Sequence, residues 1–129
     1  MNAYQTINQV AKRTGLTAYT LRYYERIGLL APVARAAGGQ RLYAPTDMAW
    51  LDFLLRLRTT HMTIGKMQIF AQLRSAGDAT VTQRRQMLES HLQEVQAEVV
   101  AMQNAVAALQ VKIDYYRGLE AGEDVSHLF

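Results

Sequence analysis

The sequence predicts a mainly α-helical protein with one small β-hairpin, ending in a long helix that pairs with a second copy of the chain. Two short amphipathic segments lie on either side of a tight turn, and a Gly-Gly pair between extended segments indicates the hairpin. A heptad pattern without Pro or Gly then occupies the last third. We expect a first domain over 1–75, a linker over 76–81, a dimerisation helix over 82–118 and a short tail over 119–129.

Composition excludes several classes of protein. Half of the 129 residues are apolar and 19% are charged, which excludes disorder along the whole chain. The chain has no cysteine, which excludes disulfides, thiolate metal sites and cysteine nucleophiles. Neither a signal peptide nor an apolar run of membrane-spanning length is evident. We therefore expect a cytoplasmic protein with no membrane partner.

The first two helices begin at threonine N-caps. Thr6 is expected to cap a helix that runs to Thr14, with Gly15 at its C-terminal end. Thr17 is expected to cap a second helix, over 18–26, that ends before Gly28. Two short helices joined by such a turn are typical of a helix-turn-helix.

A hairpin and a second helix pair follow. Residues 33–43 contain Gly38 and Gly39 between extended segments, which predicts a β-hairpin. Pro45 opens a third helix and Thr63 caps a fourth. The apolar residues of these two helices recur at helical spacing, and we expect them to face inward: Met48, Leu51, Leu54, Leu55 and Leu57, then Ile64, Met67, Phe70 and Leu73.

The long helix carries the most regular pattern in the chain. Its apolar residues alternate steps of four and three over about four heptads, which predicts a coiled-coil seam. The expected dimer-interface residues are Leu88, Leu92, Val95, Val99, Met102, Val106, Leu109, Ile113 and Tyr116. A helix within a bundle is the alternative interpretation, but the chain contains no second helix of comparable length to fill the seam.

Charges beside the seam favour an antiparallel homodimer. Glu89 and Glu98 lie in its first half, and Lys112 and Arg117 lie in its second half. In an antiparallel pair each acidic residue meets a basic residue of the partner, whereas a parallel pair places like charges together. We therefore expect the two helices to cross near residues 103–105.

The second helix has a face suited to DNA. On a helical wheel, Leu21 and Tyr24 point to one side, and the opposite side is formed by Tyr19, Arg22, Tyr23 and Arg26. Arginine binds guanine edges and phosphates, and tyrosine hydroxyls bind phosphates. An ordinary solvated basic face is the alternative. The preceding turn and the following hairpin, with its two arginines, favour DNA binding.

The charge distribution agrees with this interpretation. Residues 1–60 hold eight Lys/Arg and three Asp/Glu, a net charge of +5, whereas residues 61–129 carry −2. A basic N-terminal half followed by a mildly acidic C-terminal half is expected when the N-terminal half binds a polyanion and the C-terminal half binds protein.

The chain resembles the MerR-type transcriptional regulators. The matching runs are Tyr-Gln-Thr-Ile-Asn-Gln-Val-Ala-Lys-Arg-Thr-Gly over 4–15, Thr-Leu-Arg-Tyr-Tyr-Glu-Arg-Ile-Gly-Leu-Leu over 20–30, and Arg-Leu-Tyr over 41–43. The resemblance implies a winged helix-turn-helix that binds a pseudo-palindromic promoter site as a homodimer, and that bends and untwists the DNA so that RNA polymerase can engage. It also implies a nucleoid-associated bacterial protein.

The resemblance also implies which residues contact DNA. Tyr19, Arg22 and Tyr23 would act from the recognition helix, Arg41 and Tyr43 from the wing, and Arg58, Thr63 and Lys66 from a second wing. The helix and hairpin pattern adds further members to this set: Thr17, Arg26 and Arg35.

Some residues depart from the family pattern. Gln40 replaces the usual wing aromatic, His61 stands where glycine is common, and Gly65-Lys66 replaces an acidic pair. The absence of cysteine removes the metal and oxidant sensing of some relatives, and His61, His91 and His127 lack ligand spacing. We therefore expect no metal and no cofactor.

An apolar effector pocket is an open alternative to ordinary core packing. It would be lined by aromatic and methionine side chains of the second helix pair and of the long helix: Trp50, Phe53, Met67, Phe70, Tyr115 and Tyr116. Because the chain has no cysteine, any signal must be a non-covalent ligand, a partner or simply the protein concentration.

Other functions have less support. No phosphate-binding glycine loop, nucleophile elbow or convergent catalytic set occurs, so we do not expect an enzyme. A coiled coil that serves only as a scaffold would not explain the positive charge of residues 1–60. An architectural or excisionase-like winged-helix protein without an effector is the alternative to a transcriptional regulator, and weak, asymmetric DNA binding would distinguish it.

Overall fold

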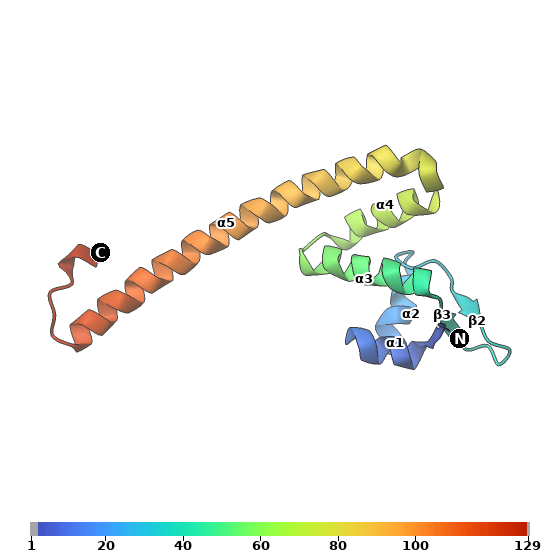
Figure 1. Cartoon of the computed structure of the whole chain (residues 1–129), viewed down its shortest axis with the longest axis horizontal. Helices are drawn as coiled ribbons and strands as arrows, with labels where there is room; N and C mark the ends of the chain where they lie inside the picture. Colours follow the sequence, from blue (N-terminus) through green and yellow to red (C-terminus); the bar gives the residue numbers. More distant parts are fainter. Residues whose placement is uncertain (1–2, 129) are drawn as a thin grey trace. The chain divides into compact units, whose positions relative to one another are not determined.

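The computed structural model describes residues 3–128. The chain is divided into two compact units, one up to Met87 and the other from Leu88 onward. Figure 1 shows the order of the elements, with four short helices and a small sheet before one long helix.

The first two helices begin and end as their caps predict. α1 (Ile7–Thr14) starts at Thr6, whose hydroxyl accepts a hydrogen bond from the Gln9 amide at 3.2 Å, and the Gln9 side chain accepts one from the Thr6 amide at 2.8 Å. α2 (Ala18–Arg26) is capped by Thr17. The predicted bounds of both helices are confirmed.

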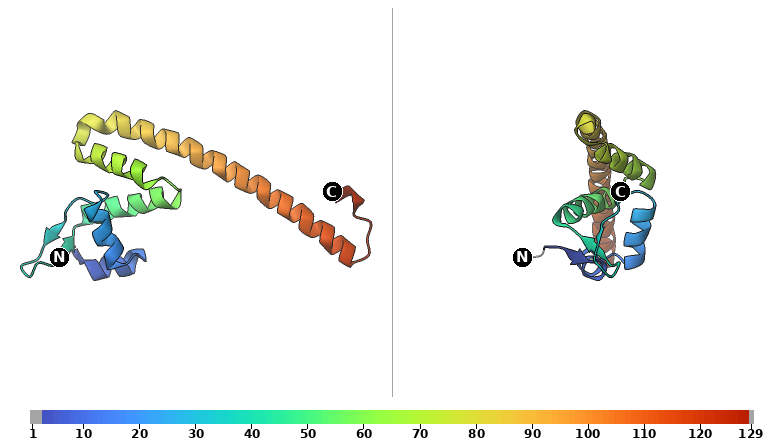
Figure 2. Two further views of the ribbon diagram at one scale, coloured as in Figure 1. Left: turned by 180° about the vertical axis from the view of Figure 1, so that it is seen from behind. Right: turned by 90° about the vertical axis from the view of Figure 1, so that its right-hand side faces the viewer.

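The hairpin is part of a three-stranded antiparallel sheet. β2 (Ala34–Arg35) and β3 (Arg41–Tyr43) form the predicted hairpin, which extends away from the helices (Figure 2). β1 (Gln5–Thr6) pairs with the other edge of β3, with Thr6 opposite Leu42. β1 was not predicted, because two residues are too few to show an alternating pattern.

The second helix pair consists of α3 (Pro45–Thr59) and α4 (Ile64–Ser75), as predicted. The expectation that Ile64 faces inward is wrong: its side chain is 47% exposed. Ile64 is the first residue of α4, directly after the N-cap Thr63, and Ala71 is buried further along the helix.

Contacts from α3 and α4 hold the end of α2. The Trp50 indole N–H donates to the Leu29 carbonyl at 2.8 Å, and the side-chain amide of Gln68 donates to the Ile27 carbonyl at 2.8 Å. Trp50 also stacks on Phe70, with ring centroids 5.8 Å apart. The second helix pair thus supports the C-terminal end of α2.

The long helix α5 (Val81–Glu120) follows a single 3-10 turn, η1 (Gly77–Thr80). Its 40 residues span about 60 Å at 1.5 Å per residue. Within residues 3–128, no helix is long and apolar enough to cross a membrane.

The end of α5 corrects a sequence-based expectation. Gly118 was expected to end the helix, but α5 continues to Glu120, and Gly122 adopts the left-handed conformation (φ 74°) that closes the helix. Val125, before η2 (Ser126–Leu128), folds back against Gly118, where an added Cβ would clash with the valine Cγ1. Gly118 therefore provides space for the tail.

Candidate nucleic-acid interface

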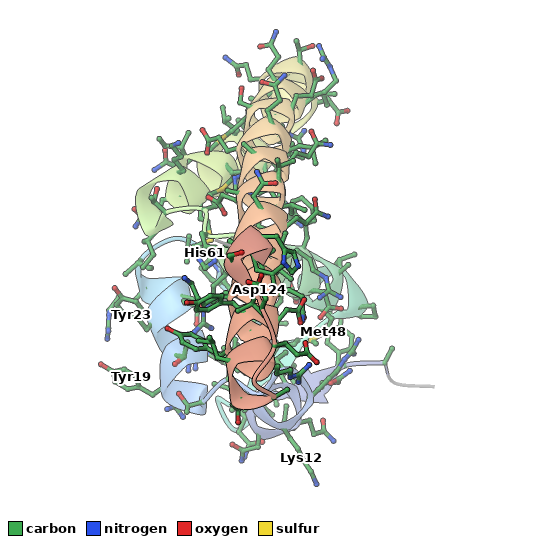
Figure 3. The ribbon with its side chains drawn as sticks, turned by 90° about the vertical axis from the view of Figure 1, so that its left-hand side faces the viewer. Lys12, Tyr19, Tyr23, Met48, His61 and Asp124 are labelled. Carbon is green, nitrogen blue, oxygen red and sulfur yellow. The ribbon has the colours of Figure 1, made fainter. Side chains whose placement is uncertain are left out.

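α2 presents one face to the core and the other to solvent. Leu21 is fully buried and Tyr24 is 7% exposed, whereas Tyr19 is 69% exposed and Arg22 is also exposed. Figure 3 shows Tyr19 and Tyr23 projecting from the same side of α2, away from the rest of the unit. The predicted division of α2 into a core face and an open face is confirmed.

Two side chains of the open face are in mutual contact. The Arg26 guanidinium lies 5.3 Å from the centroid of the Tyr23 ring. A cation over an aromatic ring keeps its charge and most of its hydrogen-bond donors. Arg26 and Tyr23 therefore form a joint surface with one positive charge and one phenol hydroxyl, a combination that can bind phosphate oxygens.

The wing is braced by one of its own arginines. Arg35 donates to the Gly39 carbonyl across the hairpin at 2.9 Å, and both residues are exposed. Gly39 has φ 85°, a conformation that glycine adopts without strain. Gln40, at the position where the family has an aromatic residue, is also exposed.

Arg41 and Tyr43 of the wing are largely shielded from solvent. Arg41 Nε donates to Glu25 Oε2 at 2.6 Å, and the two side chains are only 20% and 14% exposed. Tyr43 is 2% exposed, and burial, followed by the charge of Glu25, raises the pKa of its phenol. β3 is the central strand, so Tyr43 packs in the core. The wing contacts with DNA that the resemblance implies for Arg41 and Tyr43 stay predictions.

The predicted second wing gathers cations near the helix-turn-helix. Arg58, Thr63 and Lys66 are exposed, and Thr63 accepts a hydrogen bond from the Lys66 amide at 3.2 Å as the N-cap of α4. Arg56, Arg58 and His61 line a hollow of about 500 Å³ beside the turn after α1, and no acidic residue lines it. This surface favours an anion.

Sequence reasoning missed three residues that position α2. Glu25 holds the wing, and Trp50 and Gln68 hold the end of the helix. A lone acidic residue between Arg22 and Arg26 was a usable signal for Glu25. Trp50 and Gln68 gave no local signal, because their acceptors lie 21 and 41 residues away.

The histidines lie in separate parts of the chain. His61 lies in the turn after α3, His91 lies on α5 and His127 lies in η2. Among the residues that the structure describes, no three histidine or carboxylate side chains are grouped as metal ligands.

Comparisons with known proteins agree with this geometry. Residues 6–43 match the model of the MerR family regulatory protein. A protein of Haemophilus influenzae described as an HTH-type transcriptional regulator is 30% identical over 116 residues, which cover 90% of this chain and 86% of the relative. The chain belongs to the MerR family of transcriptional regulators.

Solved structures of MerR regulators share its fold. The structure of HiNmlR, a MerR family regulator lacking the sensor domain and bound to promoter DNA, matches with a TM-score of 0.84 and 30% identity, covering 93% of this chain and 96% of that one. A MerR family protein from Listeria monocytogenes matches with a TM-score of 0.81 and 31% identity, covering 88% and 86%. This MerR regulator therefore has the winged helix-turn-helix fold of its family.

Proposed function

We propose that this MerR regulator binds a pseudo-palindromic promoter site as a homodimer and acts by bending and untwisting the DNA, so that RNA polymerase can engage. The main observation in support of this proposal is the open face of α2. It presents two arginines and two tyrosines, while its opposite face is buried. The proposed action on promoters would take place in the bacterial cytoplasm.

Each part of the first unit has a proposed role. Residues 1–75 would contact DNA, with Tyr19, Arg22, Tyr23 and Arg26 of α2 in the major groove and Thr17 at its start. Arg35 of the wing and the second wing, formed by Arg58, Thr63 and Lys66, would contact phosphates. Tyr23 is half-buried and the other side chains are exposed, which supports the assignment.

The second unit supports a homodimer. In the single chain, the predicted seam is open to solvent along much of its length: Leu92, Val99, Met102, Val106, Leu109, Ile113 and Tyr116 are between 45% and 67% exposed. An apolar stripe of this length is stable in water when another helix covers it. We propose that residues 82–118 of a second copy cover it in antiparallel orientation, with 76–81 as the linker and 119–129 as the tail.

Selection of bound duplexes from a random DNA pool at two salt concentrations tests the proposal. We expect a two-fold-symmetric site, because two copies of α2 would read two half-sites. We also expect affinity to fall steeply as salt rises, because several phosphates would be neutralised. Weak, asymmetric binding with the same salt dependence would contradict the proposal.

The Arg22→Ala variant sharpens this test. If Arg22 reads a base, its loss costs about 1–3 kcal/mol of binding and removes the preference at one position of each half-site. Arg85→Ala is the matched control, because it also removes one positive charge but lies outside the proposed interface. An Arg22→Ala protein that keeps its full base preference would show that Arg22 reads no base.

A further inference from the structure

A second hollow lies over the aromatic side chains of α3 and α4, within the first unit. It has a volume of about 410 Å³ and is lined by Trp50, Phe53, Phe70, Arg74 and Arg84, with Thr46 and Ala49 at its side. None of these residues belongs to the proposed DNA interface. Small-molecule sites are typically of this size, about 300–1,000 Å³.

The apolar part of the hollow consists of three rings. Trp50 and Phe70 stack with ring centroids 5.8 Å apart and planes 7° from parallel. Phe53 lies 6.3 Å from Trp50 and 6.0 Å from Phe70, and it is 37% exposed. Trp50 and Phe70 are only 7% and 5% exposed, so Phe53 and the exposed edges of the other two rings form the apolar floor on which an apolar group can pack.

Two arginines stand beside these rings. The Arg74 guanidinium lies 4.5 Å from the centroid of the Trp50 ring. Arg84 Nε donates to the Thr80 hydroxyl at 3.1 Å, and its terminal nitrogen donates to the Gly77 carbonyl, also at 3.1 Å. An arginine has five N–H donors, so Arg84 is fixed in place while further donors remain for a ligand.

No acidic side chain neutralises this pair. No carboxylate lines the hollow. Within the described residues, no ion pair joins Arg74 or Arg84 to a carboxylate. Two cations without a carboxylate partner, next to an apolar surface, attract an anion that also has an apolar body.

We propose that this hollow binds a small organic anion, with its apolar body on the rings of Trp50, Phe53 and Phe70 and its carboxylate at Arg74 and Arg84. The aromatic surface favours an organic anion over inorganic phosphate, because phosphate has no apolar part to bury. The site is independent of the DNA contacts proposed above, and its test contains no DNA, so its failure leaves the proposed function standing.

Trp50 is the only tryptophan in the chain, so its fluorescence reports on this hollow directly. The probe is 4-phenylbutyrate, titrated into the full chain, with the neutral 4-phenylbutanamide as its matched control. We expect the acid to produce a saturable change and the amide to bind about tenfold more weakly, because the amide lacks the charge that the arginines recognise. Calorimetric titration of the same samples gives a second readout.

Two variants test the arginines. Arg74→Gln and Arg84→Gln should each weaken binding of 4-phenylbutyrate about tenfold, whereas Arg85→Gln, which removes a neighbouring charge outside the hollow, should leave it unchanged. Calorimetry decides for Arg74→Gln, since that change also alters the surroundings of Trp50. Ala49→Glu, which adds a carboxylate at the side of the hollow, should abolish binding without changing either arginine.

Three results of the binding titrations would overturn the proposal. These are the absence of saturable binding, equal binding of acid and amide, and full binding by both arginine variants. A Trp50 signal that changes with protein concentration and not with probe would instead show that a second copy of the chain covers the hollow, which also overturns it.

Discussion

His61 is the one non-glycine residue of the described chain with a left-handed backbone (φ 67°). It follows the last turn of α3, where its amide donates to the Arg58 carbonyl at 3.0 Å and the Met62 amide donates to the Leu57 carbonyl at 3.0 Å. A helix end closed by this pair of hydrogen bonds normally has glycine at the left-handed position. Gly28 occupies that position after α2. A side chain in this conformation costs about 1–2 kcal/mol.

His61→Gly is therefore expected to raise the free energy of unfolding by about 1 kcal/mol, because the relief of strain exceeds the added entropy of the unfolded chain. Urea denaturation measures the change. His61→Ala, which keeps the strained backbone without the imidazole, is the control and should give no gain. A less stable His61→Gly protein would mean that the imidazole makes a contact worth more than the strain.

At the scale of elements, one ion pair joins the recognition helix to the wing. Arg41 Nε of β3 lies 2.6 Å from Glu25 Oε2 of α2, and both side chains are largely shielded from water. The first unit also contains an exposed pair, Arg13 and Asp52, 3.5 Å apart with both side chains 52% exposed. Exposed pairs contribute little to stability, whereas breaking a shielded pair leaves a charge without its partner.

We expect Glu25→Gln and Arg41→Gln each to lower the free energy of unfolding by about 1–3 kcal/mol, and Asp52→Asn to change it by less than about 0.5 kcal/mol. Both Glu25→Gln and Arg41→Gln should also weaken operator binding, because each releases the wing from α2. Tighter operator binding by Glu25→Gln would contradict this positioning role, since it would show that freed Arg41 binds phosphate directly.

For the whole molecule, the proposed dimerisation through the open seam of α5 would be a condition for operator binding. Val106 is 59% exposed in the single chain and lies near the expected crossing of the two helices. Val106→Glu would place two carboxylates in an apolar seam, where neither has a partner. We therefore expect a monomer that no longer binds the operator.

Analytical ultracentrifugation of the Val106→Glu protein measures this, with circular dichroism to follow its helix content. Asn104→Glu adds the same charge two residues earlier, outside the seam, and should stay dimeric. A Val106→Glu protein that remains a dimer would show that the seam is assigned to the wrong residues.

The sequence by itself determined the elements whose stabilising groups are close together along the chain. Thr6, Thr17 and Thr63 cap helices with amides three residues ahead, and Gly15 ends α1 through its bond to the Ala11 carbonyl. The core and open faces of α2 follow from helical periodicity alone, as do the apolar positions of the seam. These features need no knowledge of distant residues.

Only the tertiary structure decided which side chains are free to act. Tyr43 is buried, and Arg41 is paired with Glu25, 16 residues away. The hollow over Trp50 is lined by residues of α3, α4 and α5. Periodicity reports which way a side chain points from its own helix or strand. It contains no information about which distant element packs there, and that packing sets burial, ion pairing and the shape of a site.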